Sequence, residues 1–220
     1  MTIKSLYRRW IGVNAVGELF GLGLTLGIGF NIIAGLEVGG VGGILLAFGV
    51  AVLSGSIEAV IVGGLQWWAM HPWFPAISRR RWFLGTLGGA LTAYVLGYLP
   101  STLMDLGQAA APAEAAAMAE PAQWLVLLLA ALLGAVAGVA LSFGQWLAMR
   151  GVVRGAKIWI PANMLAWAAG MPLIFLGMDI ANRGQPLWQS LGIMAGVLLL
   201  TGAVVGAVHG GFLVRLARAG

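Results

Sequence analysis

The sequence contains no cysteine and few charged residues, and both shortages limit what the protein can be. Without cysteine there are no disulfides and no thiolate metal sites, although this says nothing about the compartment. Only 9% of the residues are charged, whereas a soluble domain uses about 25% charged residues to solvate its surface. With 60% hydrophobic residues and a mean hydropathy of +0.95, the chain must instead be solvated by lipid.

Sequence motifs that bring catalytic residues together are also missing. There is no nucleophile elbow, no phosphate-binding loop, no His-Glu-x-x-His pattern and no pair of aspartates in a loop. The net charge of +5 is small and dispersed, which does not favour nucleic acid as a partner. We therefore predict no enzyme activity, no catalytic residue, no metal site and no nucleic-acid partner, and the sequence identifies no cofactor.

Several apolar runs are long enough to cross a bilayer, which needs about 20 helical residues. The predicted fold is therefore all-α, an integral membrane six-helix bundle that forms one transmembrane domain over residues 1–220. The expected spans are residues 10–35, 41–70, 82–103, 123–149, 158–178 and 187–213. Residues 104–122 would form an external loop, either as a short surface helix or as a mobile connection.

The basic residues predict the orientation of these spans. All of them fall on one face of the membrane, apart from Arg183, which falls on the other. Because loops rich in lysine and arginine remain in the cytoplasm, we expect both termini to be cytoplasmic. The acidic loop residues fall on the opposite face, and they are Glu37, Asp105, Glu114, Glu120 and Asp179.

Aromatic and basic side chains near the span ends favour contact with lipid head groups. The tryptophans expected to act as interfacial anchors are Trp10, Trp73, Trp82, Trp124, Trp159 and Trp188. A run of three arginines beside two of them could bind anionic head groups, or could simply set the topology and anchor the chain to lipid. The candidate head-group residues are Arg79, Arg80, Arg81, Trp73 and Trp82.

The spans also resemble one another in pairs. The second span ends on Gly-Gly-Leu-Gln-Trp-Trp-Ala-Met-His (63–71), the fourth on Phe-Gly-Gln-Trp-Leu-Ala-Met-Arg (143–150), and the sixth on a fainter copy with His209 in place of glutamine. The odd-numbered spans begin with a basic residue close to a tryptophan. Four residues after that tryptophan come Asn14, Thr86 and Asn163. We interpret this pattern as three repeated transmembrane hairpins in a pseudo-threefold arrangement.

The Gly-x-x-Gln-Trp-x-x-x-Arg-like ends of the second and fourth spans resemble a feature of uncharacterised bacterial multi-pass membrane proteins. The resemblance covers these two copies and loosely the spans around them, and the third copy departs from it at His209. That family brings no established activity. The resemblance therefore implies a location in a bacterial inner membrane and nothing about function.

Two carboxylates within the spans are the residues hardest to explain by the fold alone, because a charge in mid-membrane costs about 2.5–3.5 kcal/mol. Glu18 would lie at the depth of His209 and could pair with it if the sixth span packs beside the first, while Glu58 would lie near the bilayer centre. The candidates for a cluster that binds a ligand, a proton or an ion are Glu18, Glu58, Gln66, Gln145, His209, Asn14 and Asn163. The alternative is a structural network that holds the helices together with about 0.6 kcal/mol per hydrogen bond.

His209 has one further alternative, as a single axial ligand of a haem or of a pigment magnesium. His71 and His209 would lie at different depths, so we do not expect them to share a haem. The interfacial turn around His71 favours a residue that reaches towards the head groups.

Two function classes remain. We favour a non-enzymatic accessory or scaffold protein, or a subunit of a membrane complex that binds a hydrophobic ligand such as a lipid or pigment. The alternative is a small-solute or proton-coupled transporter or channel that uses Glu18 and Glu58. A transporter needs a polar route across the whole membrane, whereas the ionisable residues gather in the cytoplasmic half and the centre. The expected partners are the lipid bilayer and either other membrane subunits or a hydrophobic ligand.

Overall fold

The computed structural model describes residues 2–35, 39–110 and 121–219, and in these ranges every regular element is helical. The long helices are α1 (Ile3–Ala34), α2 (Gly40–Met70), α3 (Arg79–Ala110), α4 (Gln123–Met149), α5 (Trp159–Ala181) and α6 (Leu187–Ala219), and a 3₁₀ turn η1 (Ala156–Ile158) precedes α5. All six long helices have the length and the apolar composition needed to cross a membrane. The structure confirms the predicted all-α class and its six membrane-length helices.

Helices that cross a membrane must be long, because every backbone N–H and C=O group in the hydrocarbon needs a hydrogen-bond partner within the helix. Their ends follow ordinary rules. Helix α1 begins after Thr2, whose Oγ1 accepts a hydrogen bond from the Ser5 N–H at 3.2 Å. Between α4 and α5 the chain turns at Gly151 and Gly155, with φ angles of 82° and 75° that other residues rarely adopt.

Helix α3 is longer than the predicted span 82–103. It begins at Arg79 and continues through Pro100 to Ala110, so residues 104–110 are helical rather than part of an external loop. The predicted span ended where polar residues begin, because hydropathy reports how well a segment suits hydrocarbon. A helix ends where its backbone hydrogen bonds end, and that point lies further along the chain. The remainder of the expected loop, residues 111–120, lies outside the described residues, as does the predicted loop residue Glu37.

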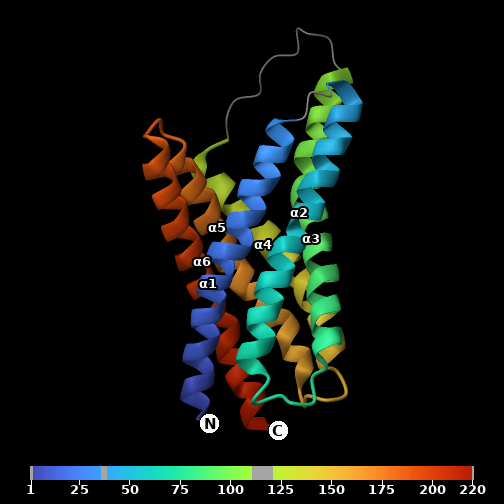
Figure 1. Ribbon diagram of the computed structural model, residues 1–220, viewed down its shortest axis with the longest axis vertical. Coiled ribbons are helices and arrows are strands. Elements are labelled where there is room, and N and C mark those ends of the chain that lie inside the picture. The colour runs from blue at the N-terminus through green and yellow to red at the C-terminus, as the bar shows by residue number, and fades with distance from the viewer. Residues whose placement is uncertain (1, 36–38, 111–120, 220) are drawn as a thin grey trace.

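The six helices form a closed ring. Each helix packs against its neighbours in the sequence, and α6 also packs against α1. Both termini lie at one end of the bundle, together with the α2–α3 and α4–α5 connections (Figure 1). We call this the basic end, because it carries Lys4, Arg8, Arg9, Arg79, Arg80, Arg81, Arg150, Arg154, Lys157, Arg215 and Arg218. The opposite end carries Asp105, Asp179 and Arg183.

Close contact between neighbouring helices depends on glycine. A Cβ atom on Gly85 of α3 would lie 2.3 Å from the carbonyl oxygen of Gly144 on α4, and one on Gly144 would lie 2.2 Å from that of Gly85. Helices α6 and α1 meet in the same way, since a Cβ on Gly202 would lie 2.4 Å from the Asn14 carbonyl oxygen. Small residues of this kind let membrane helices pack backbone to backbone.

The interior of the ring is filled at the basic end. Trp10, Trp82 and Trp159, one from each odd-numbered helix, have no exposed surface. The ring centroid of Trp159 lies 5.9 Å from that of Trp10 and 6.3 Å from that of Trp82. We call these rings and the buried side chains around them the packed core, which also contains Leu6, Met70, Ile77, Met149, Leu213 and Leu216.

The packed core overturns the prediction that Trp10, Trp82 and Trp159 are interfacial anchors. Their position near the helix ends fits an anchor, but each indole points into the bundle, where neighbouring helices bury it completely. Trp124 and Trp188 differ, because 67% and 70% of their surfaces are exposed. These two remain candidates for contact with the membrane interface.

Candidate functional site

Buried amide and hydroxyl groups next to the packed core form a hydrogen-bonded network, which we call the polar belt. Gln66 Nε2 donates to Asn14 Oδ1 at 2.8 Å. Gln145 Nε2 donates to Gln66 Oε1 and to Thr86 Oγ1, each at 3.1 Å, and Gln145 Oε1 accepts from Trp159 Nε1 at 2.8 Å. The structure therefore brings together three predicted site residues, Asn14, Gln66 and Gln145, from three different helices. Their bonds join helices to one another, and all three side chains are buried.

Three side chains also bond back to their own helices. Asn14 Nδ2 donates to the Trp10 carbonyl at 2.8 Å, and Thr86 Oγ1 donates to that of Trp82 at 2.9 Å. Asn163 Nδ2 donates in the same way to the Trp159 carbonyl at 3.0 Å. Asn163 is buried, but it forms no side-chain hydrogen bond to another helix within the described ranges, so it is not a member of the polar belt.

His209 lies against the packed core rather than beside Glu18. Its Nδ1 accepts a hydrogen bond from Trp10 Nε1 at 2.7 Å, and its ring centroid lies 5.5 Å from those of Trp10 and Trp159. Helix α6 does pack beside α1, but the expected pairing of Glu18 with His209 is wrong, because no hydrogen bond or ion pair joins the two side chains among the described residues. A ring that is 1% exposed and packed against two indoles does not favour the alternative role as an axial ligand.

The two intramembrane carboxylates, Glu18 and Glu58, lie where α1 and α2 are in contact. They are 1% and 7% exposed. A Cβ on Gly21, near Glu18 on α1, would lie 3.3 Å from the Glu58 Cα, so the two helices almost touch here. Within the described residues Glu18 Oε2 has no hydrogen-bond partner, which is unusual for a buried polar atom.

Glu58 is held in place by residues from both sides. Tyr94 Oη, from α3, donates to Glu58 Oε2 at 2.5 Å. On the other side, the Glu58 N–H donates to Thr25 Oγ1 of α1 at 3.2 Å. Tyr94 is absent from the predicted site. Its position in the middle of an apolar span was the available signal, since a hydroxyl at that depth needs an acceptor.

A cavity of about 260 Å³ lies inside the ring beside this hydrogen bond, and we call it the central cavity. Glu58, Tyr94 and Tyr98 supply the polar part of its wall. The rest of the wall is largely apolar and includes Leu22, Ala137, Leu141, Trp167, Met171 and Ile174. The described ranges contain no group of three or more His, Cys, Asp or Glu side chains placed to hold a metal ion.

The predicted head-group residues separate into two groups. Arg79, Arg80 and Arg81 are exposed at the basic end, and Trp73 is half-buried. Trp82 is fully buried in the packed core, so its predicted contact with lipid head groups is wrong. The exposed residues remain available to the membrane surface.

Comparison of the chain with protein-family models, with curated proteins and with solved structures found no match. The resemblance of the helix ends to uncharacterised bacterial membrane proteins therefore stays a prediction. The central cavity and the polar groups at its wall are the features of this structure that bear on function.

Proposed function

We propose that the protein binds a small hydrophobic ligand inside its ring of helices, as a non-enzymatic accessory or scaffold subunit of a membrane complex. The observation that supports this most directly is the central cavity, which has apolar walls and a single buried carboxylate–tyrosine pair. Pockets for small molecules are usually built in this way, with a few polar groups that fix the orientation of an otherwise apolar ligand.

The polar groups indicate the chemistry of the ligand. Glu58, the carboxylate that lines the cavity, presents acceptor oxygens, so it favours a ligand with a hydrogen-bond donor or a positive charge. The volume of about 260 Å³ lies just below the range of about 300–1,000 Å³ typical of ligand pockets. A small molecule, or one ring or tail of a lipid or pigment, therefore suits the cavity.

Gentle extraction from the native membrane, followed by native mass spectrometry and an absorption spectrum, tests this proposal. We expect a bound small molecule, with or without further subunits. Ala137→Leu narrows the cavity, whereas Ala169→Leu places the same side chain on the exposed face of α5 as a matched control. The ligand should be lost only from the first variant. Equal retention by both variants contradicts binding in the cavity, and a wild-type protein with neither ligand nor partner contradicts the proposal as a whole.

A proton-coupled transporter or channel is the second candidate, and the unpartnered Glu18 Oε2 is the observation that favours it. Ionisable residues inside a membrane often mark proton or ion pathways. The packed core argues against this candidate, because solute could cross the basic end only if its three indoles moved apart. The test is proton flux into vesicles that contain the protein. Flux that is lost in Glu18→Gln would establish transport, whereas absence of flux would contradict this candidate and favour ligand binding.

We infer that the basic end faces the cytoplasm of a bacterial inner membrane. The support is the concentration of lysine and arginine at this end. Because the chain lacks cysteine, a single introduced cysteine shows on which side of the membrane its position lies, without labelling of native thiols. In spheroplasts, an impermeant maleimide should label Asn182→Cys directly and Ser78→Cys only after lysis. The reverse pattern would overturn the orientation.

We also infer that the three hairpins are related repeats around a pseudo-threefold axis. The three indoles of the packed core meet at the centre of the ring. Two of them bond to the preceding helix of the ring at corresponding positions, Trp10 to His209 and Trp159 to Gln145. Trp82 Nε1 lacks such a bond in the described part of the chain, because Gln66 is engaged with Asn14 and Gln145.

A further inference from the structure

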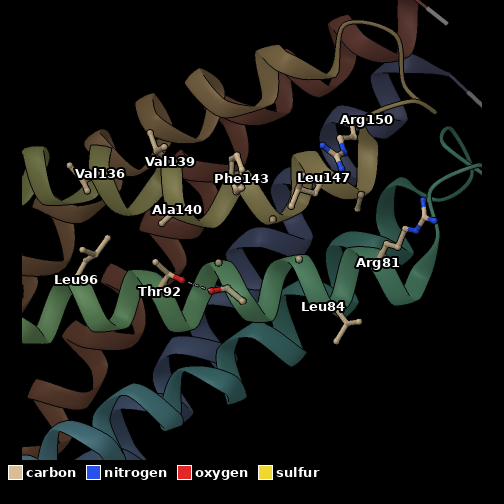
Figure 2. Close-up of a pocket in the computed structure, with 15 residues that line it drawn as sticks. Arg81, Leu84, Thr92, Leu96, Val136, Val139, Ala140, Phe143, Leu147 and Arg150 are labelled. Carbon is tan, nitrogen blue, oxygen red and sulfur yellow. Dashed lines mark hydrogen bonds between the residues drawn. The ribbon is translucent and has the colours of Figure 1, made fainter.

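A groove of about 1080 Å³ runs along the outside of the bundle between α3 and α4 (Figure 2). Its lining includes Gly85, Gly89 and Gly144, at the place where the two backbones touch. Its apolar flanks point outwards, since 37–56% of the surface is exposed for Leu84, Val136, Phe143 and Leu147. In a membrane this surface would face the acyl chains of lipid.

Two arginines lie at one end of the groove. Arg81 belongs to the first turn of α3 and Arg150 directly follows α4, so the antiparallel helices place both at the basic end, as Figure 2 shows. The guanidinium of Arg150 lies 5.6 Å from the centroid of the Trp146 ring. Neither arginine forms a salt bridge within the described ranges, where Arg183 and Asp179 form the one ion pair. Two exposed positive charges, neither with an acidic partner in the described part of the chain, thus lie beside the apolar groove.

We propose that this groove binds one anionic phospholipid, with its phosphate between Arg81 and Arg150 and an acyl chain along the glycine-lined contact. Arginine matches phosphate well, because its planar guanidinium can donate two parallel hydrogen bonds. Basic pockets between helices at the cytoplasmic surface bind anionic head groups in this way. A transmembrane helix of another protein would have to bring its own acidic residue to this depth, whereas an anionic lipid supplies charge and apolar chain together.

The dimensions of the groove agree with such an occupant. Its lining extends along α3 from Arg81 to Leu96, which lie at opposite ends of the groove in Figure 2. At the rise of an α-helix these residues are roughly 22 Å apart along the axis. One leaflet of hydrocarbon is about 15 Å thick, so the groove is long enough for an acyl chain that starts at the basic end.

Only part of the predicted arginine run contributes to this site. The guanidinium of Arg79 lies 5.5 Å from the ring centroids of Trp67 and Phe83, on the side of α3 that faces α2. Arg80 does not line the groove. The site therefore pairs Arg81 with Arg150, which directly follows the next helix, and the adjacent Arg80 provides a control with the same charge.

The test is native mass spectrometry of the full chain in detergent with equal amounts of phosphatidylglycerol and phosphatidylcholine. The wild-type protein should retain one phosphatidylglycerol in preference to phosphatidylcholine. Arg81→Gln and Arg150→Gln should each lower this retention about fivefold, and Arg80→Gln should leave it unchanged. Gly88→Leu should also lower it by filling the groove, since a Cβ on Gly88 meets nothing within 4 Å. Gly12→Leu, at an equally open position on α1, is the matched control.

Equal retention of the two lipids would overturn the proposal, and so would an equal loss in Arg80→Gln, which would indicate general attraction to the basic end. A second copy of the chain or another protein held on this face without lipid would overturn it as well. If Arg81→Gln lowers the unfolding midpoint, Arg81→Lys keeps the charge and must retain the lipid. The site is independent of the central cavity, so Ala137→Leu should not change phosphatidylglycerol retention.

Discussion

The two halves of the ring differ in how their interiors are filled. Towards the basic end, three fully buried indoles and the side chains around them fill the centre of the ring, and the amides of the polar belt bond to one another. Beyond Glu18 and Glu58 the interior holds the central cavity, whose polar wall is formed by Glu58 and two tyrosines. The comparison indicates that the first half holds the helices together, while the second has room for a ligand.

The same division separates the predicted polar residues by role. The amides Gln66 and Gln145 belong to the packed half, where their bonds connect five helices through Asn14, Thr86 and Trp159. The carboxylates of Glu18 and Glu58 lie between the packed half and the half that holds the central cavity. Glu18 Oε2 has no hydrogen-bond partner among the described residues. The amides therefore fit a structural network, and the carboxylates fit the ligand-binding interpretation better.

The largest expected effect comes from removing an aromatic ring from each half. Trp159→Ala should lower the free energy of unfolding by about 3–5 kcal/mol, because its indole is completely enclosed. Phe175→Ala should cost clearly less, because that ring already borders the central cavity and lacks packing partners there. Chemical unfolding in detergent measures both values. Equal losses would mean that the two halves are packed alike.

The next comparison adds volume instead of removing it. Ala69→Leu forces a larger side chain into the packed core and should cost about 1–3 kcal/mol. Ala137→Leu extends into the central cavity and should leave the unfolding free energy unchanged or raise it. The measurement is again unfolding in detergent, without added ligand. A large loss for Ala137→Leu would show that the central cavity is not available to a side chain.

A smaller effect should separate the three indoles of the packed core. Replacing Trp10 or Trp159 with Phe removes a hydrogen bond and leaves its acceptor unpaired, at a cost of about 1 kcal/mol beyond the loss of ring volume. Trp82→Phe removes no hydrogen bond, so it should be the mildest of the three. Thermal unfolding midpoints of the three variants, compared side by side, decide this. Equal midpoints would show that these indole bonds do not stabilise the bundle.

The smallest effect is expected at the wall of the central cavity. Tyr94→Phe removes the hydrogen bond to Glu58, and bonds between membrane helices contribute about 0.6 kcal/mol on average. A double-mutant cycle with Glu58→Leu, which provides no acceptor, isolates this contribution from the rest of the side chain. Strictly additive effects of the two substitutions would show that the bond has no net stabilising effect.

Hydropathy was sufficient to predict six membrane-length helices, but not which face of each helix turns inwards. The outside of the bundle meets lipid and much of its inside is apolar, so little in the sequence distinguishes the two faces. Trp10, Trp82 and Trp159 therefore resembled anchors, although they form the centre of the packed core. The partner of Glu58 escaped prediction for the same reason, because Tyr94 lies thirty-six residues away on a helix whose rotation was unknown.

The closed ring has one consequence for how the chain can be connected. Since α6 packs against α1 and both termini lie at the basic end, a short linker can join the two ends of the chain. New termini can then be opened in the connection between α4 and α5, residues 150–158. Such a circularly permuted protein would begin with α5 and retain every contact between helices. We therefore expect that the fold does not require α1 to come first in the chain. The order of the hairpins along the chain would then depend only on which connection carries the termini.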